Sequence, residues 1–146
     1  MEWYLKCLRQ YADFSGRARR KEYWMFILFN AIISFVLGFI DGLLGLNLLS
    51  YIYALVIFIP SLAVSVRRLH DIGRCGWWYL LPMVPFIGLS ALLAFGSFTS
   101  SAAIIVGLAA LGTGILMLVW FCTDSEGGSN KWGPNPKEEE GMNIEE

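Results

Sequence analysis

Residues 67–78 read Arg-Arg-Leu-His-Asp-Ile-Gly-Arg-Cys-Gly-Trp-Trp, a polar and aromatic segment that separates two long apolar halves of the chain. This segment holds three of the eleven Lys and Arg residues and the single histidine. Each flanking half is apolar for long enough to form a membrane hairpin. We therefore expect two helical hairpins, with residues 67–78 at the membrane surface between them.

The overall composition is typical of a membrane protein. Hydrophobic residues make up 56% of the 146 residues, charged residues only 16%, and the mean hydropathy is +0.56. An ordinary soluble domain is less apolar than this. We expect one integral membrane domain over residues 1–137, followed by an acidic and disordered tail over residues 138–146.

Four apolar stretches are long enough to cross about 30 Å of hydrocarbon as helices. Pro60 interrupts the second of them, which should continue past the membrane and end at Gly73. An amphipathic helix within residues 2–13 should precede the first, either in the membrane interface or packed on the protein's own loops. The predicted fold class is thus an all-α membrane protein with four transmembrane helices, at about residues 23–44, 48–66, 77–95 and 102–122.

The positions of the cations predict the orientation. Four spans would place the N-terminus, residues 67–78 and the C-terminus on one side of the membrane, and all eleven Lys and Arg residues would lie on that side. By the positive-inside rule, both termini are predicted to be cytoplasmic. The three cysteines fall on the same side, where thiols stay reduced, so no disulfide is expected.

Three segments of the chain resemble the signature segments of one family. They are residues 11–24 (Tyr-Ala-Asp-Phe-Ser-Gly-Arg-Ala-Arg-Arg-Lys-Glu-Tyr-Trp), residues 67–78, and residues 130–136 (Asn-Lys-Trp-Gly-Pro-Asn-Pro). In this order they are similar to the domain of unknown function 805 family, although Cys75 and Trp132 stand where Ser and Tyr are expected. The resemblance implies a small bacterial inner-membrane protein, and it supplies no activity, substrate or catalytic residue.

Arginines gather in the segments predicted to be cytoplasmic. Guanidinium groups suit phosphate, and phospholipid headgroups are the nearest phosphates. The alternative is a structural knot of ion pairs, in which Asp71 pairs with Arg67 on the same helix while Arg68 points elsewhere. The predicted site for an anion or a lipid headgroup comprises Arg17, Arg19, Arg20, Arg67, Arg68 and Arg74.

The other polar residues give weaker signals. A His-Asp dipeptide without a nucleophile or a metal partner does not define a catalytic site. Asp41, near the far end of the first span, is expected to be solvated at the outer interface. No metal and no cofactor are expected, because Cys7, His70, Cys75 and Cys122 lack the close spacing of a zinc site. The predicted polar knot comprises His70, Asp71, Trp77 and Trp78.

Three functions remain open. The first is a non-enzymatic membrane protein whose Arg- and Trp-rich cytoplasmic face binds anionic phospholipid or a protein partner. The second is a small oligomeric transporter or channel subunit, suggested by the prolines, Asn30 and Asp41. The third is an enzyme acting on lipid headgroups, which would depend on His70. Nucleic-acid binding is not expected, because the cations form juxtamembrane collars and an acidic tail follows.

Overall fold

The computed structural model describes residues 2–45, 48–94 and 100–136, so the predicted acidic tail lies outside the described residues. Within these ranges the chain contains no strand, and one isolated bridge joins Asn130 to Gly133. The all-α class is therefore confirmed. The helices are α1 (Glu2–Arg9), α2 (Arg20–Leu44), α3 (Leu48–Asp71), the 3₁₀ helix η1 (Gly76–Leu80), α4 (Met83–Ala94) and α5 (Ser100–Cys122).

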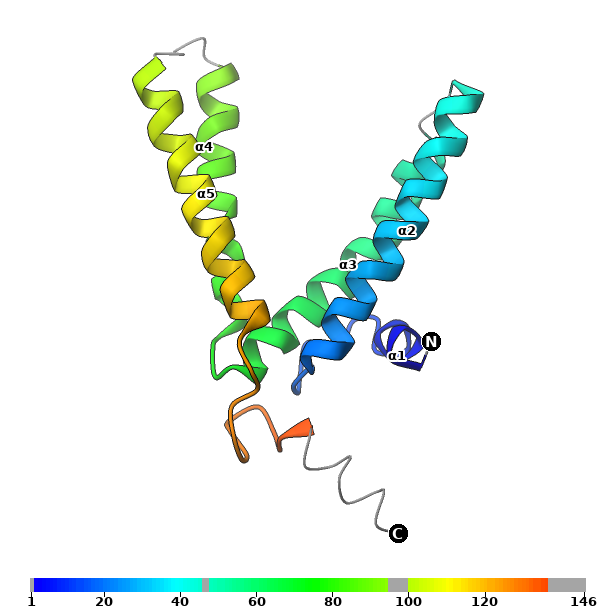
Figure 1. Ribbon diagram of the computed structural model, residues 1–146, viewed down its shortest axis with the longest axis vertical. Coiled ribbons are helices and arrows are strands. Elements are labelled where there is room, and N and C mark those ends of the chain that lie inside the picture. Colours follow the sequence, from blue (N-terminus) through cyan, green and yellow to red (C-terminus); the bar gives the residue numbers. More distant parts are fainter. Residues whose placement is uncertain (1, 46–47, 95–99, 137–146) are drawn as a thin grey trace.

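The molecule consists of two helical hairpins that diverge from a common base (Figure 1). α2 packs along α3, and α4 packs along α5. α1 lies at the base beside α2, and the segment that follows α5 also lies there. The polar segments at residues 10–19, 72–75 and 123–136 thus gather at one end of the molecule.

Within the described ranges, three helices are long and apolar enough to cross a membrane by length and composition. They are Arg20–Leu44, Leu48–Asp71 and Ser101–Cys122, and an apolar stretch of 18 residues within each has a mean hydropathy of 2.2, 2.1 and 2.5, respectively. Many of their large apolar side chains are exposed, among them Phe35, Leu55 and Leu108. Contiguous apolar surface of this extent suits hydrocarbon rather than water. The predicted spans at residues 23–44, 48–66 and 102–122 are confirmed as helices, with α3 extended to Asp71 as expected.

The predicted third span, residues 77–95, is wrong as one continuous helix. The chain forms η1, turns at Leu81 and Pro82, and only then enters α4, which has 12 residues. Neither Pro82 nor Pro85 has an N–H to donate to a carbonyl one turn earlier, so a regular α-helical ladder cannot run through both. α4 alone is shorter than the roughly 20 residues of a spanning helix.

The end of α3 is as predicted from Gly73. This glycine has φ of +73°, and the N–H of Arg74 donates to the carbonyl of Leu69 at 2.9 Å. A Cβ at position 73 would lie 2.7 Å from a carboxylate oxygen of Glu126. The positive φ therefore favours glycine at this position, and a larger residue would also have to displace the carboxylate of Glu126.

Asp41 is not the solvated residue expected from the sequence. Its side chain is buried, with the whole residue only 1% exposed. Its carboxylate accepts hydrogen bonds from the backbone N–H groups of Leu49, at 3.3 Å, and Ser50, at 2.8 Å. From the end of α2 it thus caps the N-terminus of α3, where a negative charge is favourable.

An apolar core at the base joins the hairpins. Its residues come from α1, α2, α3 and α5 and from the loop before α2. The two hairpins and the N-terminal helix therefore share this core. α1 packs on the protein through Cys7 and through Tyr4, whose ring lies 5.7 Å from that of Phe26. The buried members are Cys7, Ala18, Tyr23, Phe26, Val64, Leu69, Met117, Trp120 and Phe121.

Candidate functional site

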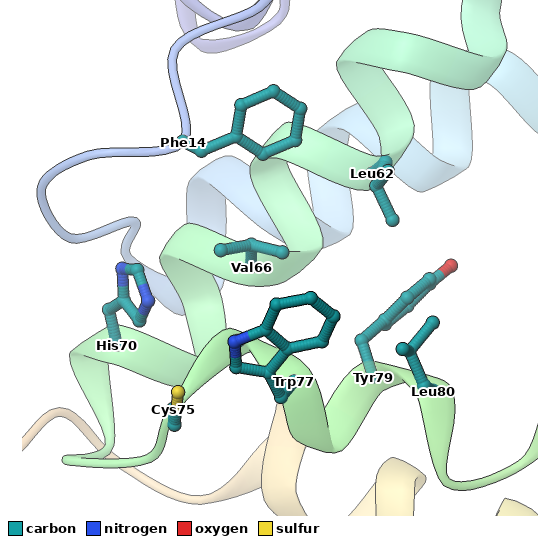
Figure 2. Close-up of a pocket in the computed structure, with 9 residues that line it drawn as sticks. Phe14, Leu62, Val66, His70, Cys75, Trp77, Tyr79 and Leu80 are labelled. Atoms are coloured by element: carbon teal, nitrogen blue, oxygen red, sulfur yellow. The ribbon is translucent and has the colours of Figure 1, made fainter.

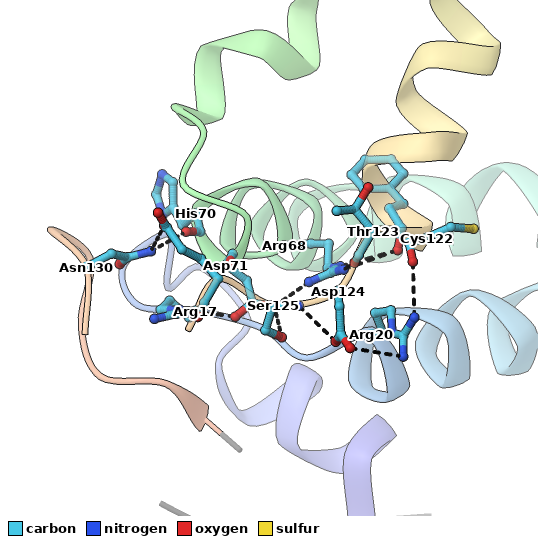
Figure 3. A network of polar contacts seen from close by, with 12 residues as sticks. Arg17, Arg20, Arg68, His70, Asp71, Cys122, Thr123, Asp124, Ser125 and Asn130 are labelled. Atoms are coloured by element: carbon cyan, nitrogen blue, oxygen red, sulfur yellow. Dashed lines mark hydrogen bonds and ion pairs between the residues drawn. The ribbon is translucent and has the colours of Figure 1, made fainter. Parts of the chain in front are cut away.

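Asp71, the last residue of α3, lies at the centre of a buried polar network (Figure 3). Its carboxylate accepts hydrogen bonds from Nε of Arg17 at 3.0 Å and from the hydroxyl of Ser125 at 2.6 Å. The guanidinium of Arg68 approaches from the other side and also donates to it. We call these four residues the Asp71 network. It connects the loop before α2, the end of α3 and the segment after α5.

Arg17 uses the rest of its guanidinium to bind backbone carbonyls. Nη1 donates to the carbonyl of Gly128 at 2.7 Å, and Nη2 donates to those of Glu126 at 2.5 Å and Asp71 at 3.2 Å. A buried charge is tolerated only when it is paired and hydrogen-bonded, and Arg17 meets both conditions. The arginine therefore fixes the course of the segment after α5.

The pairing of the two adjacent arginines is the reverse of the prediction. Asp71 pairs with Arg68, whereas Arg67 lies 3.3 Å from the carboxylate of Glu22 and also donates to Gln10. Residues three and four positions earlier both lie near Asp71 on a helix, so spacing alone does not distinguish them. The packing of α5 distinguishes the two arginines, because Arg68 also donates to the carbonyl of Phe121 at 3.4 Å.

Glu22 is the centre of a second buried charge cluster, beneath α1. Its carboxylate accepts hydrogen bonds from Nζ of Lys6 at 3.1 Å, from Arg67 at 3.3 Å and from the thiol of Cys7 at 3.6 Å. Burial and the nearby carboxylate raise the pKa of Cys7 to about 12. We call these four residues the Glu22 cluster. This cluster was not predicted from the sequence, although Glu22 at the start of an apolar span was an available signal.

His70 brings residues of all three resembling segments into contact. Its Nδ1 lies 3.3 Å from the carbonyl oxygen of Gly16, and its ring stacks on Trp132 with centroids 4.6 Å apart. Its backbone carbonyl accepts a hydrogen bond from the side chain of Asn130 at 3.0 Å. The three segments, which the predicted topology places on one side of the membrane, are therefore in direct contact.

Trp77 and Trp78 lie beside the Asp71 network rather than in it. Trp77 is 77% exposed, and Trp78 contacts Trp120 edge-on, with ring centroids 5.6 Å apart. The guanidinium of Arg74 lies 4.0 Å from the centroid of the Trp120 ring, a cation–π contact. Of the predicted polar knot, only His70 and Asp71 are therefore buried among polar partners.

The six arginines of the predicted anion site do not form one cluster. Three of them, Arg17, Arg67 and Arg68, are buried and bind carboxylates or carbonyls of the protein. Arg20 and Arg74 are exposed, while the remaining one, Arg19, is partly buried and forms the N-cap of α2. An external anion can reach the exposed pair without opening the fold.

A shallow hollow of about 370 Å³ lies where α2 begins and α5 ends. It is lined by Arg20, Lys21, Trp24, Met25 and Cys122. Arg20 donates to the carbonyl of Cys122 at 3.2 Å and lies 3.7 Å from the carboxylate of Asp124. The side chain of Arg19, the N-cap residue, makes no hydrogen bond to the first N–H groups of α2. This helix end therefore favours an anion. We call this feature the basic hollow.

A second hollow, of about 340 Å³, lies between α3 and η1 (Figure 2). Gly76 shapes it, because a Cβ at this position would lie 2.6 Å from Cγ1 of Val66. Glycine therefore lets η1 approach α3 closely. We call this feature the aromatic hollow; it is lined by Phe14, Leu62, Val66, His70, Cys75, Gly76, Trp77, Tyr79 and Leu80.

The possible metal ligands are dispersed. In residues 2–45, 48–94 and 100–136, no three or more His, Cys, Asp or Glu side chains gather in a way that could hold a metal ion. Cys7 is buried in the Glu22 cluster, whereas Cys75 and Cys122 are exposed, and all three are free thiols.

Residues 11–134 match the model of the family described as "Protein of unknown function (DUF805)". The chain belongs to this family. "Inner membrane protein YhaI" of Escherichia coli K12 is 45% identical over 139 residues, which are 94% of this chain and 97% of the relative. "Inner membrane protein YhaH" of the same organism is 41% identical over 143 residues, which are 94% and 98% of the two chains.

The similarity to a further relative is partial. "Uncharacterized protein YiiR" of Escherichia coli K12 is 34% identical over 79 residues, about half of each chain (53% and 54%). No solved structure matches the chain. Together with the apolar helices, the family match confirms the prediction of a multi-pass membrane protein of this family.

Proposed function

We propose that this protein is a non-enzymatic, four-span protein of the bacterial inner membrane whose cytoplasmic face binds anionic phospholipid. The observation that carries the proposal is the basic hollow. There the exposed cations Arg20 and Lys21 adjoin the indole of Trp24 and the apolar side chain of Met25. A membrane leaflet presents lipid phosphates, then the interfacial region, then acyl chains. The two cations, the indole and the apolar side chain follow the same order in the hollow.

The ion pair that Arg20 makes with Asp124 leaves room for this binding. Its two side chains are 47% and 57% exposed, and such surface pairs contribute little to stability. A lipid phosphate can therefore replace Asp124 as the partner of Arg20, with Lys21 as the second cation. Because each cation near an anionic surface contributes about 1 kcal/mol, two should favour an anionic headgroup by roughly 30-fold.

Retention of lipid by the purified protein tests the proposal. Native mass spectrometry of protein supplied with phosphatidylglycerol or phosphatidylcholine should show preferential retention of phosphatidylglycerol. The double variant Arg20→Gln/Lys21→Gln should lose most of this preference. The control Arg9→Gln/Lys131→Gln removes as much charge at exposed positions outside the hollow. Equal retention by both double variants would refute the proposed site.

The four-span topology is supported by the second hairpin. The helical rise over η1 and α4 totals about 28 Å, close to the roughly 30 Å of the hydrocarbon layer. α4 also packs along α5 as α2 packs along α3 (Figure 1). The collection of cations on the base side supports cytoplasmic termini, and two relatives are named inner-membrane proteins.

Cys75 provides a test of this orientation, because it is exposed between α3 and η1. In a Cys122→Ala background, a membrane-impermeant maleimide should label Cys75 in inside-out vesicles and leave it unlabelled in intact spheroplasts. Labelling in spheroplasts and not in inside-out vesicles would place the base outside the cytoplasm.

The alternatives receive less support. Asn30 donates to the carbonyl of Phe26 at 2.7 Å and bonds to the hydroxyl of Tyr53, while Asp41 caps α3. These contacts occupy the side chains on which the transporter hypothesis depends. The enzyme hypothesis depends on His70, whose Nδ1 contacts the backbone carbonyl of Gly16 and whose ring stacks on an indole.

A further inference from the structure

We infer that the aromatic hollow between α3 and η1 binds an uncharged, lipid-soluble ring that carries a hydroxyl group, the class that includes phenols and quinols. This site is distinct from the basic hollow, and the inference does not depend on the proposed binding of phospholipid.

The lining determines the charge and shape of the ligand. At about 340 Å³ the hollow falls within the range of small-molecule sites, roughly 300–1,000 Å³. None of its nine lining residues is Lys, Arg, Asp or Glu, so an ionised ligand would lose its hydration without gaining a partner. Phe14, Trp77 and Tyr79 supply aromatic rings, which favour contact with a flat ring.

The imidazole of His70 marks one end of the hollow, while the other end is mainly apolar and also holds the hydroxyl of Tyr79 (Figure 2). His70 lies at one end, and Leu62 and Leu80 lie at the opposite end (Figure 2). The neighbouring residues of α3 towards that end, such as Phe58, are apolar and exposed. A ligand dissolved in the membrane can therefore enter past the leucines and turn its polar group towards the histidine.

The hydrogen bond of His70 specifies that polar group. A carbonyl oxygen only accepts, so the contact of Nδ1 with the carbonyl of Gly16 at 3.3 Å places the proton of a neutral imidazole on Nδ1. Nε2 then presents a lone pair. The ring edge that carries Nε2 faces Val66 and Trp77 across the hollow (Figure 2). Nε2 therefore offers an acceptor, and the indole N–H of Trp77, on the same side of the hollow, offers a donor, so a hydroxyl group, which both donates and accepts, matches the site (Figure 2).

The imidazole is held in place before any ligand arrives. Its ring stacks on Trp132 at an interplanar angle of 11°, and the backbone carbonyl of His70 accepts a hydrogen bond from the side-chain amide of Asn130. The close contact of Gly76 with Val66 fixes the facing wall. Binding therefore costs little conformational entropy in these side chains, which favours affinity.

The single histidine of the chain makes the inference directly testable. Protein labelled with ¹⁵N-histidine and reconstituted in lipid nanodiscs is titrated with 2-naphthol and, separately, with its methyl ether. Naphthol should shift the Nε2 resonance and bind about tenfold more tightly than the ether, which has no hydroxyl to donate. Equal shifts and equal affinities for the two compounds would overturn the hydrogen-bonding role of His70.

Two variants test the location. Leu62→Trp fills the hollow from α3 and should weaken naphthol binding at least tenfold, whereas Leu55→Trp, at a 75% exposed position of the same helix, should leave it unchanged. Trp77→Ala removes a highly exposed ring without opening the core and should weaken binding several-fold. Unchanged binding in both Leu62→Trp and Trp77→Ala would overturn the inference.

Discussion

The carboxylate of Asp71 lies 3.0 Å from Nε of Arg17, a residue 54 positions earlier, and neither side chain is more than 1% exposed. The same carboxylate binds Arg68 from its own helix and Ser125 from the segment after α5. One charged group thus joins the parts of the chain that precede, connect and follow the two hairpins. Its removal should loosen the base of the molecule.

Asp71→Asn should strongly destabilise the protein. The change leaves the guanidinium groups of Arg17 and Arg68 buried without a negative partner, and breaking a buried ion pair costs about 3–5 kcal/mol. The free energy of unfolding can be measured by titration with sodium dodecyl sulfate in mixed micelles. Asp124→Asn, which affects an exposed pair with Arg20, should cost less than about 1 kcal/mol. Similar costs for the two variants would show that the charge of Asp71 is not structural.

Asp41→Ala should weaken the first hairpin through the loss of a helix cap. The carboxylate binds two N–H groups at the start of α3, and such caps contribute about 0.5–2 kcal/mol. Gly42→Ala is the matched control, because nothing lies within 4 Å of a Cβ at that position. The same unfolding titration should show a loss for Asp41→Ala alone. Equal stability of the two variants would argue against the capping role.

Hydropathy was sufficient to predict the three long apolar helices. The positions of α2, α3 and α5 follow from long, mainly apolar stretches, and the end of α3 follows from Gly73. The third span was predicted wrongly as one continuous helix, because composition registers apolar residues and not the missing N–H groups of Pro82 and Pro85. Backbone hydrogen bonding, rather than hydrophobicity, decides the structure of that segment.

The candidate site was predicted only in outline. The sequence indicated which segments meet, and His70 with Asp71 lies where they do. It did not indicate that Arg68, rather than Arg67, pairs with Asp71, because that choice depends on α5, which is distant in sequence. The two hollows could not be predicted from the sequence either, since each depends on how two separate helices approach one another.

Gly76→Ala should separate η1 from α3. The new methyl group would lie 2.6 Å from Cγ1 of Val66, and overpacking of this kind costs about 1–3 kcal/mol. Val66→Ala in the same chain should restore much of the loss, because it removes the clashing atoms. The thermal unfolding midpoints of both single variants and the double variant test this coupling. Additive losses would mean that the two residues do not contact one another.

Cys7 should be the least reactive of the three thiols. Burial, reinforced by the carboxylate of Glu22, raises its pKa to about 12, and only the thiolate attacks an alkylating reagent. At pH 8 roughly one Cys7 thiol in ten thousand is ionised, against about a quarter for an ordinary thiol of pKa about 8.5. In the double variant Cys75→Ala/Cys122→Ala, alkylation by iodoacetamide should therefore be slow and should accelerate about tenfold per pH unit above pH 8.

The matched comparison is the exposed thiol of Cys75, isolated by replacing Cys7 and Cys122 with alanine. It should react at the rate of a small-molecule thiol in the folded protein, and denaturation should bring Cys7 to the same rate. Comparable rates for Cys7 and Cys75 in the folded protein would mean that α1 does not stay packed over Glu22. Because Arg67 binds the same carboxylate, the reactivity of Cys7 also reports whether the Glu22 cluster is closed.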